Sequence, residues 1–301
     1  AWLILAEEDE ATGARCAGLA REFLKPSPQA DRPLIFAGTD AGFVELNRDR
    51  PERGVADGVS WAIHPPLDAG DNLSLLETFA GQWQTVLSAR ELCEGRLMVS
   101  PLTLRARITP GAGTIPTAVP PDELPPEVDV RQMSLFGAVW TLGSIASLSR
   151  KPLLRSVTCF ETTGWLGVME WSDRPRLAPR FVSRPGWVFP MYFVFALLAG
   201  HDECRPWAVD RSDHAGLFIR RGAAPEAVRL LVANCTRDVL ELTLPTWFKT
   251  ERTLVLDHTN AVAFMREPEA LLGRGWVAGE RNQLALEPYA VAALDGIERR
   301  G

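Results

Sequence analysis

Short, mainly apolar runs alternate with longer helical segments over the first 200 residues, and this alternation constrains the fold more than any other feature. The runs are four or five residues long and lie at 2–6, 33–37, 59–63, 97–100 and 156–160. Strands buried on both faces have this composition, because parallel sheets are covered by helices on either side. The repeat of strand, loop and helix therefore predicts an α/β fold with a parallel sheet.

Two helices between these strands have recognisable starts. A capping box at Ser74 predicts a helix that extends to about residue 92, and its Asp/Gln analogue at Asp129 predicts one that extends to about residue 149. The second helix carries an apolar stripe that includes Trp140. We expect this stripe to pack against the sheet rather than to hold a ligand.

The pattern changes after residue 201, where apolar and polar residues alternate between turns and no helical period is evident. Strand-like segments lie at 228–233, 239–244, 253–256 and 283–294. A period of two predicts antiparallel strands with one buried face, and several such strands predict a β-sandwich. We therefore divide the chain into an α/β region at 1–203, which the family resemblance given below identifies as a partial, catalytic (β/α) barrel, and a β-sandwich accessory domain at 204–301.

Composition excludes several classes of function. The net charge of -6 argues against a nucleic-acid partner, and no apolar run approaches the roughly 20 residues of a membrane span. The four histidines are not spaced as metal ligands, so we expect no metal and no cofactor. The five cysteines contain no CxxC pair, so we expect reduced thiols and a cytoplasmic compartment. The oligomeric state is left open.

Two glutamates that follow predicted strands are the candidate catalytic residues, Glu45 and Glu161. Hydrolysis of a glycoside or a lactone needs one carboxylate that activates water or attacks, and one group that protonates the departing oxygen. Glu161 lies between an apolar strand and a Gly-Trp turn, where an unpaired charge would be costly unless it is used. The structural alternative for Glu45 is an ion pair with Arg48 or Arg50.

Polar side chains near the ends of the same strands complete the predicted pocket. His64 follows the run at 59–63, and its imidazole suits a proton shuttle or an oxyanion donor, although a lone histidine here is as often structural. Arg105 follows the run at 97–100 and suits a clamp for a carbonyl or hydroxyl group. Asp71 suits a turn or a helix cap. The predicted substrate-binding residues are Asp40, Asn47, Arg48, His64, Asp68, Arg105, Thr163 and Trp165.

Four segments resemble the D-apionate lactonases, which are bacterial sugar-catabolic enzymes related in build to barrel glycoside hydrolases. The matching segments are Gly38-Thr39-Asp40 with Phe43, Glu45, Leu46, Asn47 and Arg48; Val99-Ser100-Pro101 with Thr103-Leu104-Arg105; Arg131-Gln132-Met133-Ser134-Leu135-Phe136-Gly137-Ala138; and Glu161-Thr162-Thr163-Gly164-Trp165 with Gly167-Val168-Met169-Glu170. The resemblance implies a (β/α)8 TIM-type barrel that hydrolyses a branched-sugar lactone, with Glu45 and Glu161 in the pocket. It also implies that Ala1 begins near the fourth barrel strand, so that the chain is a truncated barrel followed by the β-sandwich.

The chain departs from this family after the strand at 59–63. Similar proteins have Asn-Pro-Gln-Val-His where this chain has His64-Pro65-Pro66-Leu67-Asp68. We therefore keep three hypotheses. In the first, the protein is a lactonase or acts on a sister substrate; Glu161 orients or activates water and Glu45, with Asn47 and His64, stabilises or protonates the leaving ring oxygen, or the two glutamates exchange these roles. In the second, it is a retaining glycoside hydrolase with Glu45 as acid/base and Glu161 as nucleophile, and in the third it is an inactive carbohydrate-binding remnant. The expected partner in each case is a small sugar or sugar lactone.

Overall fold

The computed structural model describes residues 1–5, 12–24, 32–66, 68–93, 95–107, 123–172, 181, 183–201, 203–208, 212–220 and 226–299. The chain forms two compact units. The first consists of residues 1–70, 80–119 and 151–160, and the second of residues 71–79, 120–150 and 161–301. Each unit is described by itself below, and the predicted domain boundary at residues 203 and 204 stays a prediction.

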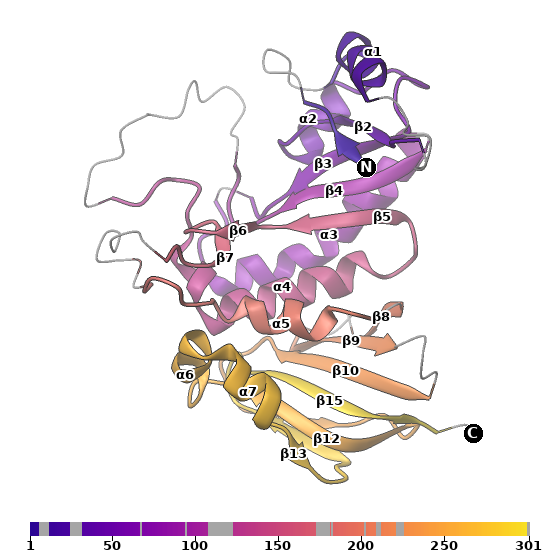
Figure 1. The fold of residues 1–301 in the computed structure, drawn as a ribbon. Helices are drawn as coiled ribbons and strands as arrows, with labels where there is room; N and C mark the ends of the chain where they lie inside the picture. Colours follow the sequence, from indigo (N-terminus) through magenta and orange to yellow (C-terminus); the bar gives the residue numbers. More distant parts are fainter. Residues whose placement is uncertain are drawn as a thin grey trace. The chain divides into compact units, whose positions relative to one another are not determined.

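The first unit contains a five-stranded parallel sheet, and its strands follow one another in chain order (Figure 1). The strands are β1 (Trp2–Leu3), β2 (Ile35–Gly38), β3 (Gly58–Ile63), β4 (Arg96–Leu102) and β5 (Leu154–Cys159). All five coincide with predicted apolar runs. Each strand pairs in parallel with the next one along the chain, and helices connect them. (β/α) barrels are built from this repeat, so the predicted α/β barrel-type fold is confirmed.

The centre of this sheet is buried on both faces, as the apolar runs predicted. Phe36, Trp61, Leu97 and Val99 are all inaccessible to solvent. Gly38 ends β2 with a positive φ of 147°, and a Cβ at this position would lie 1.9 Å from the carbonyl oxygen of Ser60. Only glycine therefore allows β2 to turn into its loop at this close approach to β3.

Helices and loops connect the strands, and the start of the longest helix differs from the prediction. The helices before residue 200 are α1 (Ala14–Phe23), α2 (Phe43–Arg48), α3 (Asn72–Leu92), the 3₁₀ helix η1 (Val130–Met133), α4 (Leu135–Leu148) and α5 (Met191–Leu198). Asp71, not Ser74, caps α3, because its Oδ1 accepts a hydrogen bond from the Ser74 amide at 3.0 Å. Hydrogen bonds from Ser74 also lower the pKa of Asp71. The helix-cap interpretation of Asp71 is therefore the one the structure realises.

The second unit contains the helix predicted from Asp129, but its start is also shifted. Asp129 caps η1 by accepting a 2.9 Å hydrogen bond from the Arg131 amide, and α4 begins only at Leu135. Helix α4 is buried around almost its whole circumference and contacts β9 and β10, so the sheet it packs against within its own unit is the antiparallel one. A Cβ at Gly143 would lie 2.2 Å from the Phe79 ring. The small residue thus permits close packing between α4 and the first turns of α3.

The carboxyl-terminal part of this unit is the predicted antiparallel β-sandwich. A six-stranded sheet has the order β13-β12-β15-β10-β9-β8, and a second sheet pairs β11 with β14. Leu230, Leu242 and Leu286 are among the buried side chains packed between the two sheets. The strands are β8 (Glu203–Ala208), β9 (His214–Arg220), β10 (Ala227–Asn234), β11 (Leu240–Thr243), β12 (Phe248–Leu256), β13 (Val277–Ala278), β14 (Gln283–Leu286) and β15 (Val291–Glu298).

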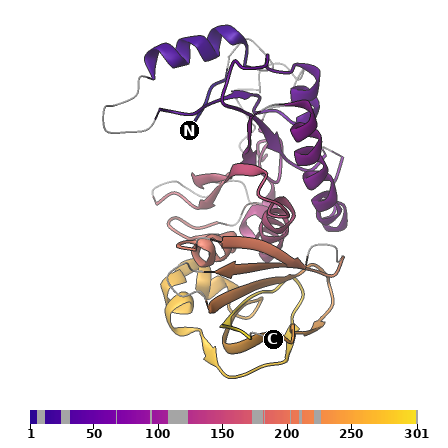
Figure 2. The ribbon, with the colours of Figure 1, turned by 90° about the vertical axis from the view of Figure 1, so that its right-hand side faces the viewer.

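Two short helices in this region contradict the expectation that no helical segment follows residue 201. They are α6 (Ala261–Arg266) and α7 (Pro268–Arg274), which lie beside each other next to the six-stranded sheet (Figures 1 and 2). Six or seven residues span fewer than two helical turns, so their periodicity is too short to recognise among the surrounding strands. No helix in the described part of the chain has both the length and the apolar character that crossing a membrane requires.

Candidate active site

The carboxyl edge of the parallel sheet carries most of the predicted site residues. Asp40 and Glu45 follow β2, His64 follows β3, and Arg105 follows β4. Backbone hydrogen bonds continue past the strand ends, since the Ala62 amide donates to the Ala41 carbonyl at 2.9 Å. The loops after neighbouring strands are thereby held along one edge, which is where barrel enzymes place their catalytic groups.

Glu45 lies on α2 rather than at the end of a strand, which corrects the sequence prediction. Gly42 precedes the helix, and Glu45 is in its first turn. The Glu45 side chain is only 14% exposed, and Nη1 of Arg48 is 3.8 Å from its Oε1. Arg48 is 70% exposed, so this ion pair is weak. Arg50 instead donates to Asn47 Oδ1 at 2.7 Å. Of the two arginines predicted as partners of Glu45, Arg48 is thus the one that pairs with it.

His64 presents a ring nitrogen near the Glu45 carboxylate. Its Nδ1 is 2.9 Å from the carbonyl oxygen of Pro65. Because a carbonyl oxygen only accepts hydrogen bonds, this contact places the proton of the neutral ring on Nδ1 and leaves a lone pair on Nε2. A Cβ built on Gly42 would lie 3.2 Å from Glu45 Oε2 and 3.7 Å from His64 Nε2. The carboxylate and the basic nitrogen thus face the same point, and both groups suit proton transfer there.

Asp40 is a second partly buried carboxyl group on the same loop. Burial raises its pKa, and a hydrogen bond from its own backbone amide offsets only part of this effect. No ion pair to Asp40 occurs within the described ranges. A raised pKa makes Asp40 a further candidate for proton transfer, and its predicted role in substrate binding stays a prediction.

The remaining predicted residues of the first unit lie further from this point. Asp68 is exposed in a turn, and Asn47 is exposed on α2 with its amide oxygen bound by Arg50. Arg105 is half-buried, and its carbonyl oxygen accepts a 2.8 Å hydrogen bond from the Thr103 hydroxyl. Their predicted roles as substrate contacts stay predictions.

Glu161 lies in the second unit, on a small pair of strands, β6 (Glu161–Thr163) and β7 (Gly167–Met169). The Glu161 amide donates to Leu166 at 3.0 Å, which fixes the turn between the strands. The Glu161 side chain is exposed, and Thr163 and Trp165 are half-buried. The expectation that an unpaired charge is costly here is wrong, because solvent reaches the carboxylate. Glu45 and Glu161 belong to different compact units, and their predicted convergence stays a prediction.

Glu170 is a buried carboxylate that was not among the predicted site residues. It follows β7 with 7% exposure, accepts a 2.9 Å hydrogen bond from the Trp171 amide, and accepts another from the Ser183 hydroxyl. No cation pairs with it in the described part of the chain. The available signal was its position directly after a short apolar strand. Its hydrogen bond with Ser183, thirteen residues further along the chain, left no local signal.

The comparisons with known proteins concern the chain as a whole rather than single site residues. A model of the D-apionate lactonase TIM barrel domain matches residues 28–203. No curated protein matches the sequence significantly. Among solved structures, a family 51 α-L-arabinofuranosidase from Bifidobacterium longum is 9% identical, with a TM-score of 0.50 over 94% of this chain and 61% of that one. A 4-O-α-L-rhamnosyl-β-D-glucuronidase from Fusarium oxysporum is 12% identical, with a TM-score of 0.48 over 93% and 62%.

These structural likenesses concern the fold alone, because the identities are low and the chain spans less than two thirds of either solved protein. Of the two, only the arabinofuranosidase reaches a TM-score of 0.50, and this likeness agrees with the barrel-type fold. The family match carries more weight, since residues 28–203 make up more than half of the chain and include the parallel strands β2 to β5. On this match the protein belongs to the D-apionate lactonase family.

Proposed function

We propose that this protein hydrolyses the lactone of a sugar acid to the open acid. The observation that carries the proposal is the approach of Glu45 Oε2 and His64 Nε2 to one point beside Gly42, at the carboxyl edge of a barrel-type sheet. A base with a free lone pair and a carboxylate near it are the groups that lactone hydrolysis needs. The membership of the chain in a lactonase family supports the ester bond as the target.

In the proposed reaction, water adds to the lactone carbonyl carbon and the bond from that carbon to the ring oxygen breaks. Glu161 orients or activates the water, and the proton that the water loses passes to a basic group in the pocket. His64 Nε2 accepts that proton and returns it to the ring oxygen as it leaves, while Glu45 stabilises the charged imidazole, so that the product carries one new carboxyl group and one new hydroxyl group. The half-buried Asp40, whose pKa is raised by burial, is a further group that can take part in this proton transfer.

The proposed substrate is a small sugar lactone, and its hydroxyl groups would contact the polar side chains around the sheet edge. Asn47, Arg48 and Arg105 are the side chains that we assign to this role, with Asp68 at the exposed rim and Thr163 and Trp165 beside Glu161. His64 and Asp68 replace residues that are usual in the family, and we therefore expect a substrate related to D-apionolactone rather than that compound alone.

The test is an assay of the full-length protein against a panel of sugar lactones and aryl glycosides. We expect lactone turnover, and we expect Glu161→Gln and His64→Gln each to lower the rate by about 10² to 10⁴. Glu91→Gln is the matched control, because Glu91 is exposed at the end of α3 in the described structure.

Other outcomes would contradict this proposal in distinct ways. Turnover of aryl glycosides without lactones would identify a retaining glycosidase, whose two carboxyl groups must lie about 5 to 5.5 Å apart. Sugar binding without any turnover would indicate a binding protein. An unchanged rate in Glu161→Gln would remove that residue from the mechanism.

A further inference from the structure

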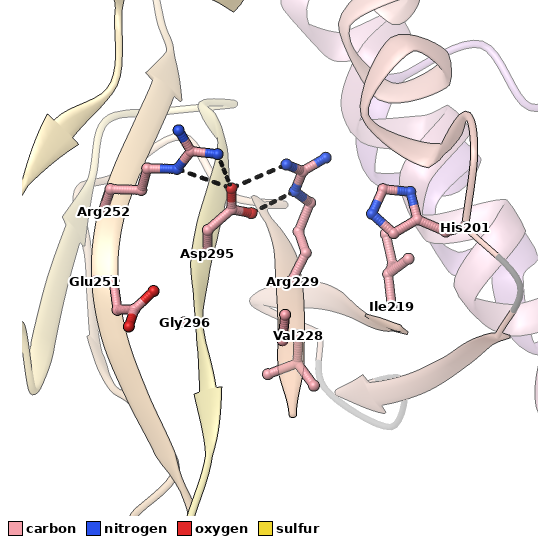
Figure 3. A pocket seen from close by; sticks show the side chains of 9 residues that line it. His201, Ile219, Val228, Arg229, Glu251, Arg252, Asp295 and Gly296 are labelled. Carbon is pink, nitrogen blue, oxygen red and sulfur yellow. Dashed lines mark hydrogen bonds and ion pairs between the residues drawn. The ribbon is translucent and has the colours of Figure 1, made fainter. Parts of the chain in front are cut away.

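A pocket lies on the six-stranded antiparallel sheet, within the second unit. Its volume is about 270 Å³, and it is lined by residues of β9, β10, β12 and β15 together with His201 (Figure 3). None of these residues belongs to the candidate active site. The polar lining includes Arg229, Glu251, Arg252 and Asp295.

A β-bulge places two neighbouring charged side chains in this pocket. Thr250 pairs with Gly296 and Arg252 pairs with Asp295, so Glu251 is an extra residue in β12. In a regular strand, Glu251 and Arg252 would point to opposite faces, whereas here both line the same cavity. A Cβ at Gly296 would lie 2.1 Å from the Lys249 carbonyl oxygen, so glycine is required for the approach of β15 to β12.

The arginines of the pocket are held in fixed positions by one carboxylate. Arg229 and Arg252 reach Asp295 from the strands on either side of it (Figure 3). Arg229 donates to Asp295 Oδ1 at 2.6 Å and Oδ2 at 3.0 Å, and Arg252 donates twice to Oδ2 at 3.0 and 2.6 Å. Both guanidinium groups also lie over the Trp276 ring. Groups held in this way are arranged before any ligand arrives, which lowers the entropic cost of binding.

Two groups of the pocket remain open for a ligand. Nη1 of Arg252 and the carboxylate of Glu251 take part in no hydrogen bond or ion pair with the residues that the structure describes, and Arg252 is 50% exposed. One is a donor and the other an acceptor. The formal charges of Arg229, Arg252, Asp295 and Glu251 cancel, so the pocket has no net preference for an anion or a cation.

We propose that this pocket binds a neutral polyhydroxylated molecule the size of a monosaccharide. A hydroxyl group both donates and accepts, so neighbouring hydroxyls of one sugar ring can bind the Arg252 guanidinium and the Glu251 carboxylate together. The volume is slightly below the roughly 300 to 1,000 Å³ of sites for drug-sized ligands, which suits a single sugar ring. The site is separate from the proposed lactonase chemistry and does not depend on it.

The test measures binding of D-xylose and D-glucose by saturation-transfer NMR and isothermal titration, with D-glucuronate and inorganic phosphate as charged probes. We expect millimolar binding of the neutral sugars, weakened about 10- to 100-fold in Arg252→Met. That variant keeps both hydrogen bonds between Arg229 and Asp295. Arg266→Met is the matched control, since Arg266 is 64% exposed and pairs with Glu267 outside the pocket.

A variant of the candidate active site separates this proposal from the preceding one. Glu45→Gln combined with Glu161→Gln should leave the sugar binding intact even where turnover is lost. Loss of sugar binding in that double variant, or unchanged binding in Arg252→Met, would overturn the second site. Tighter binding of glucuronate or phosphate than of the neutral sugars would overturn the ligand class.

Discussion

Replacement of Asp295 by asparagine tests how strongly the Arg229–Asp295–Arg252 cluster stabilises the second unit. The carboxylate is 17% exposed and accepts four hydrogen bonds, two from each arginine. Asparagine keeps one acceptor oxygen but removes the charge, and it leaves Arg229, which is 11% exposed, without its ionic partner. Loss of one partner of a buried ion pair costs about 3 to 5 kcal/mol.

The expected loss of unfolding free energy is smaller than that range. Arg252 is half exposed, and exposed ion pairs contribute only about 0 to 1 kcal/mol. We therefore expect Asp295→Asn to lower the free energy of unfolding by about 2 to 3 kcal/mol at pH 7. Urea unfolding followed by circular dichroism and tryptophan fluorescence measures this difference. Asp238→Asn is the control, because Asp238 is exposed and its carboxylate has no contact within the described ranges.

The same variant has a predicted pH dependence. Burial acts to raise the pKa of Asp295, but the hydrogen bonds and charges of Arg229 and Arg252 outweigh it and lower the pKa. The stabilisation from a carboxylate with a lowered pKa is present above the unfolded-state pKa of about 3.9 and is lost as the pH falls through the folded-state value. The difference between wild type and variant should therefore be full at pH 5 to 7 and shrink below about pH 4. A difference under about 1 kcal/mol at pH 7, or one independent of pH, would refute this reasoning.

Three further predictions concern packing, a buried amide and the thiols. Gly143→Ala should lower the free energy of unfolding by about 1 to 3 kcal/mol, since its Cβ would meet the Phe79 ring at 2.2 Å; an unchanged urea midpoint would argue against the close packing. Asn234→Ala should cost about 1 to 3 kcal/mol in the same assay, because the NH2 group of the buried Asn234 shares its two hydrogens among the carbonyl oxygens of Asp238, Leu286 and Glu287, and these contacts would be lost. Burial raises the pKa of Cys159 and of Cys235 to about 12, so the thiolate fraction of each is on the order of 10⁻⁴ at pH 8. Mass spectrometry after iodoacetamide treatment should therefore find both thiols unlabelled until urea is added.

Local features of the sequence were enough to predict the strands of the parallel sheet and the β-sandwich. An apolar run such as 59–63 becomes a buried strand because its composition favours burial on both faces, whatever lies elsewhere in the chain. Alternation of apolar and polar residues, as at 228–233, likewise reports one buried face. The candidate residue His64 could be named for the same reason, since a polar group directly after a strand lies at the sheet edge, whereas Glu45 lies further along the chain, on α2.

Other features depended on contacts between residues that are far apart in the chain. Glu170 accepts a hydrogen bond from Ser183, thirteen residues further along the chain, and the pocket on the antiparallel sheet requires β10, β12 and β15 to pair with a bulge at Glu251. The starts of the two helices were displaced, because Asp71 caps α3 ahead of Ser74 and Asp129 caps the 3₁₀ helix η1 that precedes α4.

The sequence by itself therefore determined the type and order of the main strands and the residues at the carboxyl edge of the parallel sheet, since these follow from local periodicity. Only the tertiary structure decided that Glu45 stands on a helix facing His64 Nε2, that Glu161 is exposed, and that Arg229 and Arg252 meet at Asp295. The burial and pKa of a side chain, and the shape of a pocket, depend on which distant segments pack together. The periodicity of one segment does not predict which other segments will pack against it.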